Sequence, residues 1–131
     1  MRPLAEFPAD ERRMLRGVFC DIDDTLTTDG RLSAEAYGAM ERLERANLLV
    51  VAVTGRPAGW CDALARMWPI DAVVGENGAF YFRYDRVRRR MQRHFTDSAH
   101  TRRRNRERLA AIGAEIVHAV PGAAISADQA Y

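Results

Sequence analysis

The sequence predicts an α/β fold, with a Rossmann-like three-layer core built on a parallel sheet and followed by the start of an α+β cap module. Three apolar runs have the length and composition of buried strands, and they cover residues 17–20, 48–53 and 70–74. Segments with helical spacing alternate with them, and each run ends in polar or glycine-rich residues. Such alternation favours parallel strands joined by right-handed crossovers.

Two helices are expected between these strands. Ser33 has the side chain of an N-cap, and apolar residues recur at helical spacing after it, which predicts a helix over 33–47. Pro57 suits the first turn of a second helix that ends before Pro69. The residues before Arg16 form a polar lead-in with a short helix around 9–15.

The period of the pattern changes after residue 78. Residues 79–84 and 88–95 are expected to form two strands joined by a turn near Asp85. Asp97 or Ser98 then caps a helix that runs to Gly113, and a further strand is expected over 115–120. We place a boundary near Tyr81, with 1–80 as the N-terminal part of the Rossmann-like catalytic core and 81–131 as the incomplete beginning of an α/β cap.

Composition narrows the class of protein. The chain of 131 residues has a net charge of +2 and contains no lysine, so its positive side chains are all arginine. No apolar segment approaches the length that spans a bilayer, and the N-terminus is too charged for a signal peptide, so we expect a cytoplasmic protein without a membrane partner. Cys20 and Cys61 show neither metal-type spacing nor a disulfide pattern, which indicates core thiols in a reducing compartment.

An arginine-rich stretch covers residues 83–108 and contains eleven arginines. Arginine binds phosphate bidentately and stacks on bases, so nucleic acid is one partner to consider. The stretch lacks the interleaved aromatic residues of a stacking platform. A solvated helix and hairpin face therefore explains it better, and nucleic acid is an unlikely partner.

Three polar blocks follow the three predicted strands. They are Asp21-Ile22-Asp23-Asp24-Thr25, Thr54-Gly55-Arg56 and Glu76-Asn77-Gly78-Ala79. An isolated pair of aspartates two residues apart more often stabilises a turn than forms a functional site. Three blocks at the carboxyl ends of three strands, where open α/β sheets bind ligands, argue against coincidence.

With these blocks in this order, the chain resembles the haloacid dehalogenase superfamily, and in particular its Cof-type phosphatases, which insert an α/β cap after the third strand. The resemblance implies that Asp21 is the nucleophile that becomes an aspartyl-phosphate. It implies that Asp23 is the general acid toward the leaving alcohol and then the base for water. Mg²⁺ would be held by the Asp21 carboxylate and the Asp23 backbone carbonyl.

The resemblance also assigns the substrate-binding residues. Thr54 would donate a hydrogen bond to a phosphoryl oxygen, and Gly55 would let the backbone come close. Arg56 would position the substrate or its own loop, with a buried structural ion pair as the alternative, and Asn77 would contact substrate or hold its loop. Because Asp23 must hold a proton as an acid, we expect its pKa to be raised by partial burial and the neighbouring anion.

The expected function is therefore a Mg²⁺-dependent phosphomonoester hydrolase that acts on a small phosphorylated metabolite such as a sugar phosphate. The alternatives are a phosphomutase of the same superfamily, a non-catalytic fragment and an arginine-rich nucleic-acid-binding module. The family also uses a cationic side chain after the cap, usually lysine, and a late acidic cluster, and neither has a counterpart here. We therefore expect the front half of a phosphatase, with feeble Mg²⁺ binding, little turnover and an exposed sheet edge that favours self-association.

Overall fold

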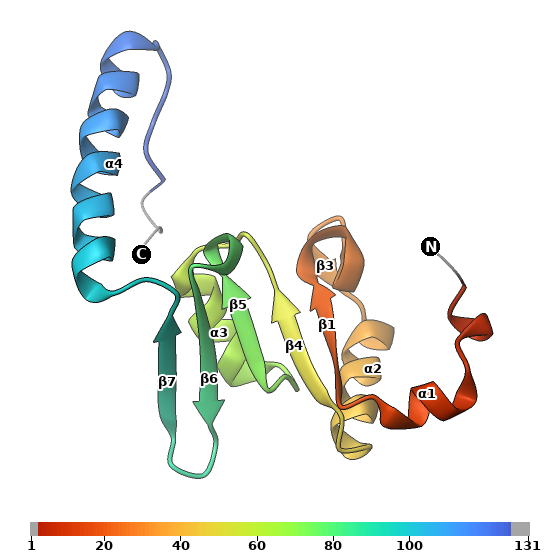
Figure 1. Ribbon diagram of the computed structural model, residues 1–131. Coiled ribbons are helices and arrows are strands. Elements are labelled where there is room, and N and C mark those ends of the chain that lie inside the picture. Colours follow the sequence, from red (N-terminus) through yellow and green to blue (C-terminus); the bar gives the residue numbers. More distant parts are fainter. Residues whose placement is uncertain (1–2, 127–131) are drawn as a thin grey trace.

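The computed structural model describes residues 3–126, and its centre is a five-stranded mixed sheet with the order β1-β4-β5-β6-β7 (Figure 1). The first three of these strands are parallel, as predicted, and β6 and β7 form an antiparallel hairpin. The α/β fold and the hairpin are confirmed. The strand bounds are β1 (Gly17–Asp21), β4 (Leu49–Val53), β5 (Ala72–Gly75), β6 (Phe80–Asp85) and β7 (Arg90–Phe95).

The hairpin continues the same sheet, because β6 pairs with β5 along residues 80–82. The sheet therefore has no break at Tyr81, where the sequence places the boundary between the core and the cap. The division into 1–80 and 81–131 stays a prediction.

Both predicted crossover helices are present. They are α2 (Ala34–Arg45) and α3 (Ala58–Met67), and a short α1 (Ala9–Met14) follows the 3₁₀ turn η1 (Leu4–Glu6) at the N-terminus. The Ser33 hydroxyl accepts a hydrogen bond from the backbone N–H of Ala36 at 3.1 Å, which confirms it as the N-cap of α2. Pro57 directly precedes α3, whose first turn does not need the missing N–H.

The core lies between one face of the sheet and the helices α2 and α3. Val50, Ala52 and Val73 alternate along β4 and β5 on this face and are buried. Phe80 and Phe82 of β6 stack there with ring centroids 4.3 Å apart. Burial, followed by the charge of Glu76, raises the pKa of the Cys61 thiol to about 11, so it packs as a neutral core group as the sequence predicts.

The opposite face of the sheet carries no helix among residues 3–126. Phe19, Leu49 and Tyr81 point to this side and are 76%, 52% and 42% exposed. The described residues therefore form two layers, and the third layer of the predicted core is not among them. An apolar sheet face of this kind normally packs against another element.

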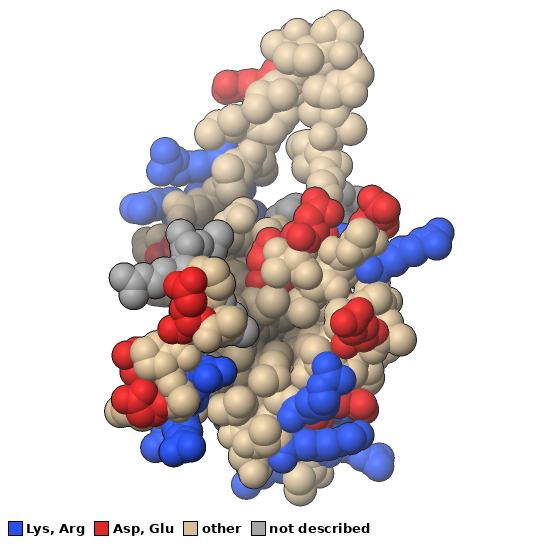
Figure 2. All heavy atoms as spheres, turned by 90° about the vertical axis from the view of Figure 1, so that its right-hand side faces the viewer, with Lys and Arg blue, Asp and Glu red and all other residues tan. Residues whose placement is uncertain are grey.

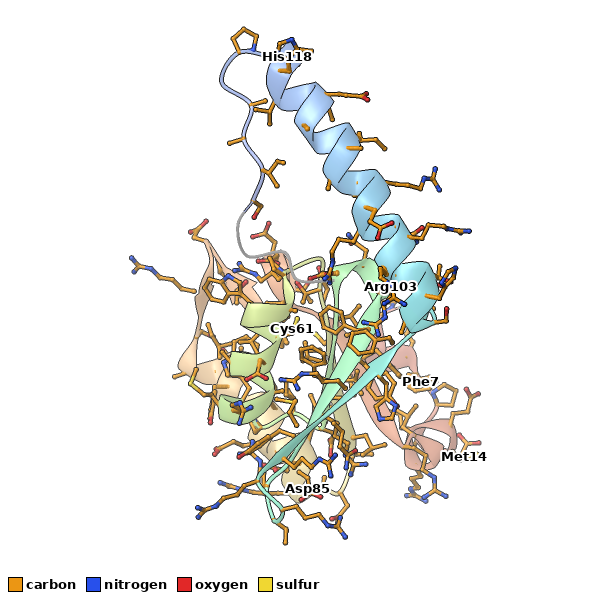
Figure 3. All side chains as sticks on the ribbon, turned by 90° about the vertical axis from the view of Figure 1, so that its left-hand side faces the viewer. Phe7, Met14, Cys61, Asp85, Arg103 and His118 are labelled. Atoms are coloured by element: carbon orange, nitrogen blue, oxygen red, sulfur yellow. The ribbon has the colours of Figure 1, made fainter. Side chains whose placement is uncertain are left out.

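The end of the chain departs from the sequence prediction. A single helix α4 (Ala99–Ala119) of 21 residues stands where the sequence predicts a helix to Gly113 and a strand over 115–120. The helix rises away from the sheet (Figure 1), and its side chains, Arg103 and His118 among them, project around it (Figure 3). The strand prediction is wrong because these residues meet no strand edge, and a helix satisfies its own backbone hydrogen bonds without one.

Neither α4 nor any other helix within residues 3–126 is both long enough and apolar enough to cross a membrane.

Candidate active site

The polar blocks of the sequence meet at one edge of the sheet. Asp21 is the last residue of β1, Thr54 follows the end of β4, and the 3₁₀ turn η3 (Glu76–Gly78) follows β5. Asp21 pairs in register with Val53, which pairs with Val74, so the three strand ends lie side by side (Figure 1). The structure therefore places all three blocks at the carboxyl edge, as parallel strands require.

The loop after β1 is closed by local hydrogen bonding. It forms the π-type turn η2 (Ile22–Leu26), in which Asp24 has a φ of +56°. The buried Thr27 hydroxyl donates to the carbonyl oxygen of Ile22 at 2.9 Å. This contact ties the end of the loop to its beginning and so limits the positions that Asp23 can take.

A small hairpin follows this loop and is absent from the elements predicted above. It consists of β2 (Thr27–Thr28) and β3 (Arg31–Leu32), with Asp29 and Gly30 in the turn at φ values of +51° and +71°. An Asp-Gly pair at positive φ is a strong signal for a two-residue hairpin. The signal is present in the sequence, although the strands are only two residues long.

Asp23 forms an ion pair with Arg56 of the next block. The Arg56 Nη2 donates to Oδ1 at 2.6 Å, and Nε donates to Oδ1 and Oδ2 at 3.1 and 3.2 Å. The Thr54 hydroxyl adds a weak contact to Oδ2 at 3.5 Å. The side chains of Arg56 and Asp23 are 30% and 46% exposed, so the ion pair of the structural alternative is present, but it is partly solvated and not buried. The role of Arg56 toward substrate stays a prediction.

This pair reverses the expected protonation of Asp23. Hydrogen bonds from Arg56 lower the pKa of Asp23, desolvation opposes them, and the charge of Arg56 and the contact from Thr54 lower it further. The expectation of a raised pKa is therefore wrong for this arrangement. The physical reason is that a guanidinium bound to both oxygens stabilises the carboxylate by more than its slight burial costs.

Thr54 and Arg56 hold each other through a local contact. The backbone N–H of Arg56 donates to the Thr54 hydroxyl at 3.1 Å, and Thr54 is only 3% exposed. The hydroxyl of Thr54 thus joins the backbone of its own block to the carboxylate of Asp23. The role of Thr54 toward a phosphoryl oxygen stays a prediction.

Three further groups contact Arg56. Its guanidinium carbon lies 4.8 Å from the ring centroid of Trp60, in a cation–π contact. Its carbonyl oxygen accepts from the backbone N–H of Glu76 at 3.2 Å and from the Cys61 thiol at 3.7 Å. Trp60 is not among the site residues predicted from the sequence, and because Arg56 lies before α3 begins, the spacing rule for side-chain pairs on one helix does not identify this contact.

Gly55 lets the second and third blocks approach closely. A Cβ atom at Gly55 would lie 3.1 Å from Oδ1 of Asn77, which is tighter than ordinary packing. Glu76 and Asn77 both have positive φ, at +46° and +56°, and the Glu76 carboxylate accepts from the backbone N–H of Ala58 at 3.1 Å. The structure therefore places Asn77 beside Gly55, and Glu76 satisfies a free N–H at the start of α3.

The described residues supply only part of a Mg²⁺ site. Within residues 3–126 no three His, Cys, Asp or Glu side chains come together as metal ligands. Asp21 is exposed at the end of β1, and its carboxylate and the carbonyl of Asp23 are the oxygen donors that Mg²⁺ prefers. Their chemistry fits Mg²⁺, although Mg²⁺ usually needs one or two carboxylates together with substrate phosphate.

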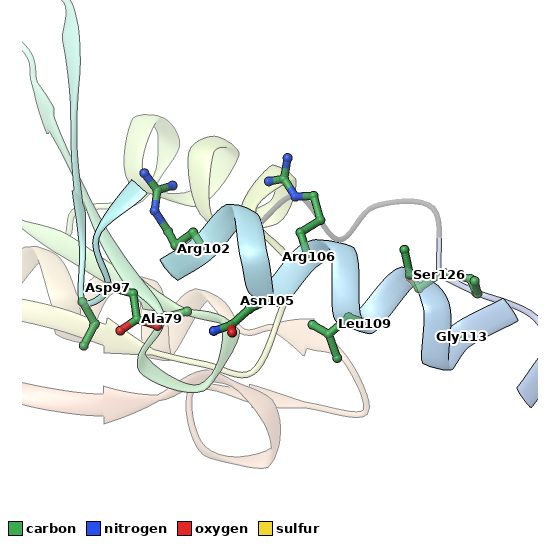
Figure 4. A pocket seen from close by; sticks show the side chains of 11 residues that line it. Ala79, Asp97, Arg102, Asn105, Arg106, Leu109, Gly113 and Ser126 are labelled. Carbon is green, nitrogen blue, oxygen red and sulfur yellow. The ribbon is translucent and has the colours of Figure 1, made fainter. Parts of the chain in front are cut away.

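A pocket with a volume of about 520 Å³ lies between α4, the end of β7, residues 125–126 and Ala79, the last residue of the third block (Figure 4). None of the predicted site residues lines it. The candidate site is instead an open edge, and on the β1 side of the molecule acidic and arginine side chains are interspersed with uncharged residues (Figure 2).

Comparisons with known proteins agree with this arrangement. A family model for haloacid dehalogenase-like hydrolases matches residues 18–102, which include all three blocks. No curated protein matches the chain.

Two solved structures share the fold. A haloacid dehalogenase-like hydrolase from B. subtilis superposes with a TM-score of 0.56 at 23% identity, covering 77% of this chain and 34% of that one. A hypothetical protein from Geobacillus kaustophilus HTA426 superposes with a TM-score of 0.55 at 23% identity, covering 78% and 36%. The chain thus spans about a third of the length of each of these structures.

Proposed function

Because the chain belongs to the haloacid dehalogenase-like hydrolase family, we propose that it provides the front part of a Mg²⁺-dependent phosphomonoester hydrolase for small metabolites such as sugar phosphates. The observation that carries this proposal is the pair of carboxylates at the end of β1. Asp21 is exposed to an incoming ester, whereas Asp23 is held by Arg56 and Thr54. The two carboxylates thus have different surroundings, as two different roles require.

Asp21 is the proposed nucleophile. One of its carboxylate oxygens forms a bond to phosphorus, the ester P–O bond breaks, and the alcohol leaves with a proton. Water then attacks the aspartyl-phosphate and releases inorganic phosphate. Mg²⁺, held by the Asp21 carboxylate and the Asp23 carbonyl, would neutralise part of the phosphate charge.

Asp23 is the proposed proton carrier, and its ion pair with Arg56 makes the two halves of the reaction unequal. A charged Asp23 is ready to accept a proton from the attacking water. Before it can donate a proton to the leaving alcohol, it must first take up a proton from the solvent and give up hydrogen bonds to Arg56. We therefore expect the first half of the reaction to depend strongly on how good the leaving group is.

Replacing Asp21 by asparagine tests the nucleophile. An amide cannot form the phosphoenzyme, so Asp21→Asn should lose release of phosphate from p-nitrophenyl phosphate by many orders of magnitude. It should also lose the mass increase of one phosphoryl group after acid quenching. Asp24→Asn is the matched control, because Asp24 is a neighbouring exposed carboxylate at positive φ, which asparagine tolerates.

Activity of Asp21→Asn within about tenfold of the parent would contradict the assignment. A phosphomutase would be distinguished by phosphate that stays on the product instead of passing to water.

A non-catalytic role is the second candidate. It is favoured by the incomplete set of metal ligands within residues 3–126 and by the absence of lysine from the sequence. Release of phosphate by the purified chain with saturating Mg²⁺ and a panel of phosphate esters would exclude this candidate. A folded chain without turnover fits both candidates, since little turnover is expected of the front part alone.

The arginine-rich stretch is better explained by structural contacts than by nucleic acid. Arg86 donates to the carbonyl oxygens of Arg66 and Trp68 at the end of α3, at 3.2 and 2.8 Å. Arg93 pairs with Asp62 at 3.3 Å. These contacts give Arg86 and Arg93 a structural role. We propose a phosphorylated metabolite, and not nucleic acid, as the partner, and a cytoplasmic location.

A further inference from the structure

We propose that Trp60 is a positioning residue of the candidate site, whose ring holds the Arg56 guanidinium in the orientation that binds both oxygens of Asp23. The proposal rests on the proposed function, because it adds Trp60 to the groups that serve Asp21 and Asp23. Trp60 lies outside the three polar blocks.

The location of Trp60 is not explained by core packing. The buried residues of α3 are Ala58, Cys61, Leu64 and Ala65, whereas Trp60 is 51% exposed. A large aromatic side chain on the solvated side of a helix gains little from burial. The contact that the structure gives its ring is the guanidinium of Arg56, at 4.8 Å.

The helix gives this ring a fixed base. Trp60 lies in the first turn of α3, and its backbone N–H donates to the carbonyl oxygen of Pro57 at 3.1 Å. Arg56 is four residues earlier, just before the helix begins. The guanidinium therefore has the ring on one side and the Asp23 carboxylate at its N–H groups.

An arginine side chain that is 30% exposed needs such a second contact to keep one orientation. Its stem has several rotatable bonds, and a single ion pair in water does not restrict them well. A ring whose centroid lies 4.8 Å from the guanidinium carbon contacts the guanidinium while the N–H groups of Arg56 bind the carboxylate. Trp60, Arg56 and Asp23 thus form one chain of contacts from α3 to the loop after β1.

Loss of the Trp60 ring should weaken the hydrogen bonds from Arg56 to Asp23 without removing either partner of the ion pair. Arg56 would then sample other rotamers, and the remaining contact to Asp23 would be the 3.5 Å hydrogen bond from Thr54. Proton donation by Asp23 would then become easier, whereas the exposed Asp21 would keep its surroundings.

The test compares Trp60→Leu, which removes the ring, with Trp60→Phe, which keeps one. Tyr81→Leu is the matched control, since Tyr81 is an aromatic residue of similar exposure on β6, stacked on His94. The direct readout is the NMR signal of the Arg56 Nε–H, assigned by its disappearance in Arg56→Lys. We expect its exchange with water to accelerate about two- to fivefold in Trp60→Leu, to stay near the parent in Trp60→Phe and to be unchanged in Tyr81→Leu.

An unchanged Arg56 signal in a folded Trp60→Leu variant would overturn the proposal. If Trp60→Leu loses the native circular dichroism spectrum, Trp60→Met, which keeps apolar bulk without a ring, takes its place under the same criterion. The NMR signal decides the proposal even for a chain without turnover, so it is independent of the proposed function.

Turnover gives a second readout when it is present. The rate ratio between p-nitrophenyl phosphate and an alkyl phosphate should fall in Trp60→Leu, because a carboxylate held less firmly by Arg56 takes up and donates a proton more easily, and it should return toward the parent in Trp60→Phe. An equal change with both esters would count against a role through Asp23.

Discussion

Replacing Gly75 by alanine tests how tightly the end of β5 packs beneath the candidate site. A Cβ atom at this position would lie 2.6 Å from the Cys61 sulfur and closer still to the ring of Phe80. Both neighbours are buried, at 0% and 2% exposure. The backbone of Gly75 is extended, with φ −123° and ψ 171°, so alanine suits the conformation and the clash alone determines the cost.

The magnitude follows from what can move. Phe80 is stacked on Phe82 with centroids 4.3 Å apart and meets Phe95 edge-on at 6.4 Å, so its ring has little room to retreat. Cys61 is fixed on α3. An added methyl group in a well-packed core costs about 1–3 kcal/mol, and we expect the upper part of that range. This is a large share of the stability of a small domain, which is about 5–15 kcal/mol.

Urea unfolding followed by circular dichroism measures the effect. With a slope of about 1–3 kcal/mol per molar urea, the midpoint should fall by about 1 M or more with an unchanged slope. Gly59→Ala is the matched control, because no atom lies within 4 Å of the place that its methyl group would take in α3, and it should gain up to about 1 kcal/mol from helix propensity.

The double variant Gly75→Ala, Phe80→Leu should lose less than the sum of the two single losses, since the smaller side chain makes room for the methyl group. A Gly75→Ala variant within about 0.5 kcal/mol of the parent would refute the reasoning and show that this part of the core is loosely packed.

Three further predictions concern other parts of the chain. The pKa of Asp62 is lowered by hydrogen bonds from Arg66, against the effect of desolvation, and by the charges of Arg66 and Arg93. The ion pairs of Asp62 should therefore stabilise the folded state above the unfolded pKa of about 3.9, and this stabilisation should be lost as pH falls through the lower folded pKa. Asp62→Asn should therefore lose up to about 1 kcal/mol at pH 7 in urea unfolding, and a gap that persists at pH 2 would argue against the ion pairs as its cause. Ser33→Ala should lose about 1 kcal/mol by removing the N-cap of α2, whereas Ser33→Asp should retain it; equal losses would contradict the capping role. Phe19→Thr should reduce self-association in light scattering with little change in unfolding, because Phe19 is 76% exposed on the uncovered sheet face, and an unchanged apparent mass would exclude that face as the contact.

Local patterns in the sequence determined most of the elements. The Ser33 cap, Pro57 before α3 and the apolar run of β4 each follow rules that involve only neighbouring residues, and each was predicted correctly. The convergence of the three polar blocks was also predictable, because parallel strands place their carboxyl ends at one edge whatever their partners are. The Asp29-Gly30 hairpin belongs to the same class, since its turn signal is local even though it was not among the predicted elements.

Contacts between distant residues decided the rest. Arg56 lies 33 positions from Asp23, and only their meeting in space determines that the pKa of Asp23 falls instead of rising. Residues 115–120 have strand-like composition, yet whether they form a strand depends on an available sheet edge, and residues 115–119 instead continue α4. A local sequence pattern determines the conformational preference of one segment. The charge partner of a side chain, the neighbour of a strand and the covered face of a sheet each depend on two segments, which only the tertiary structure brings together.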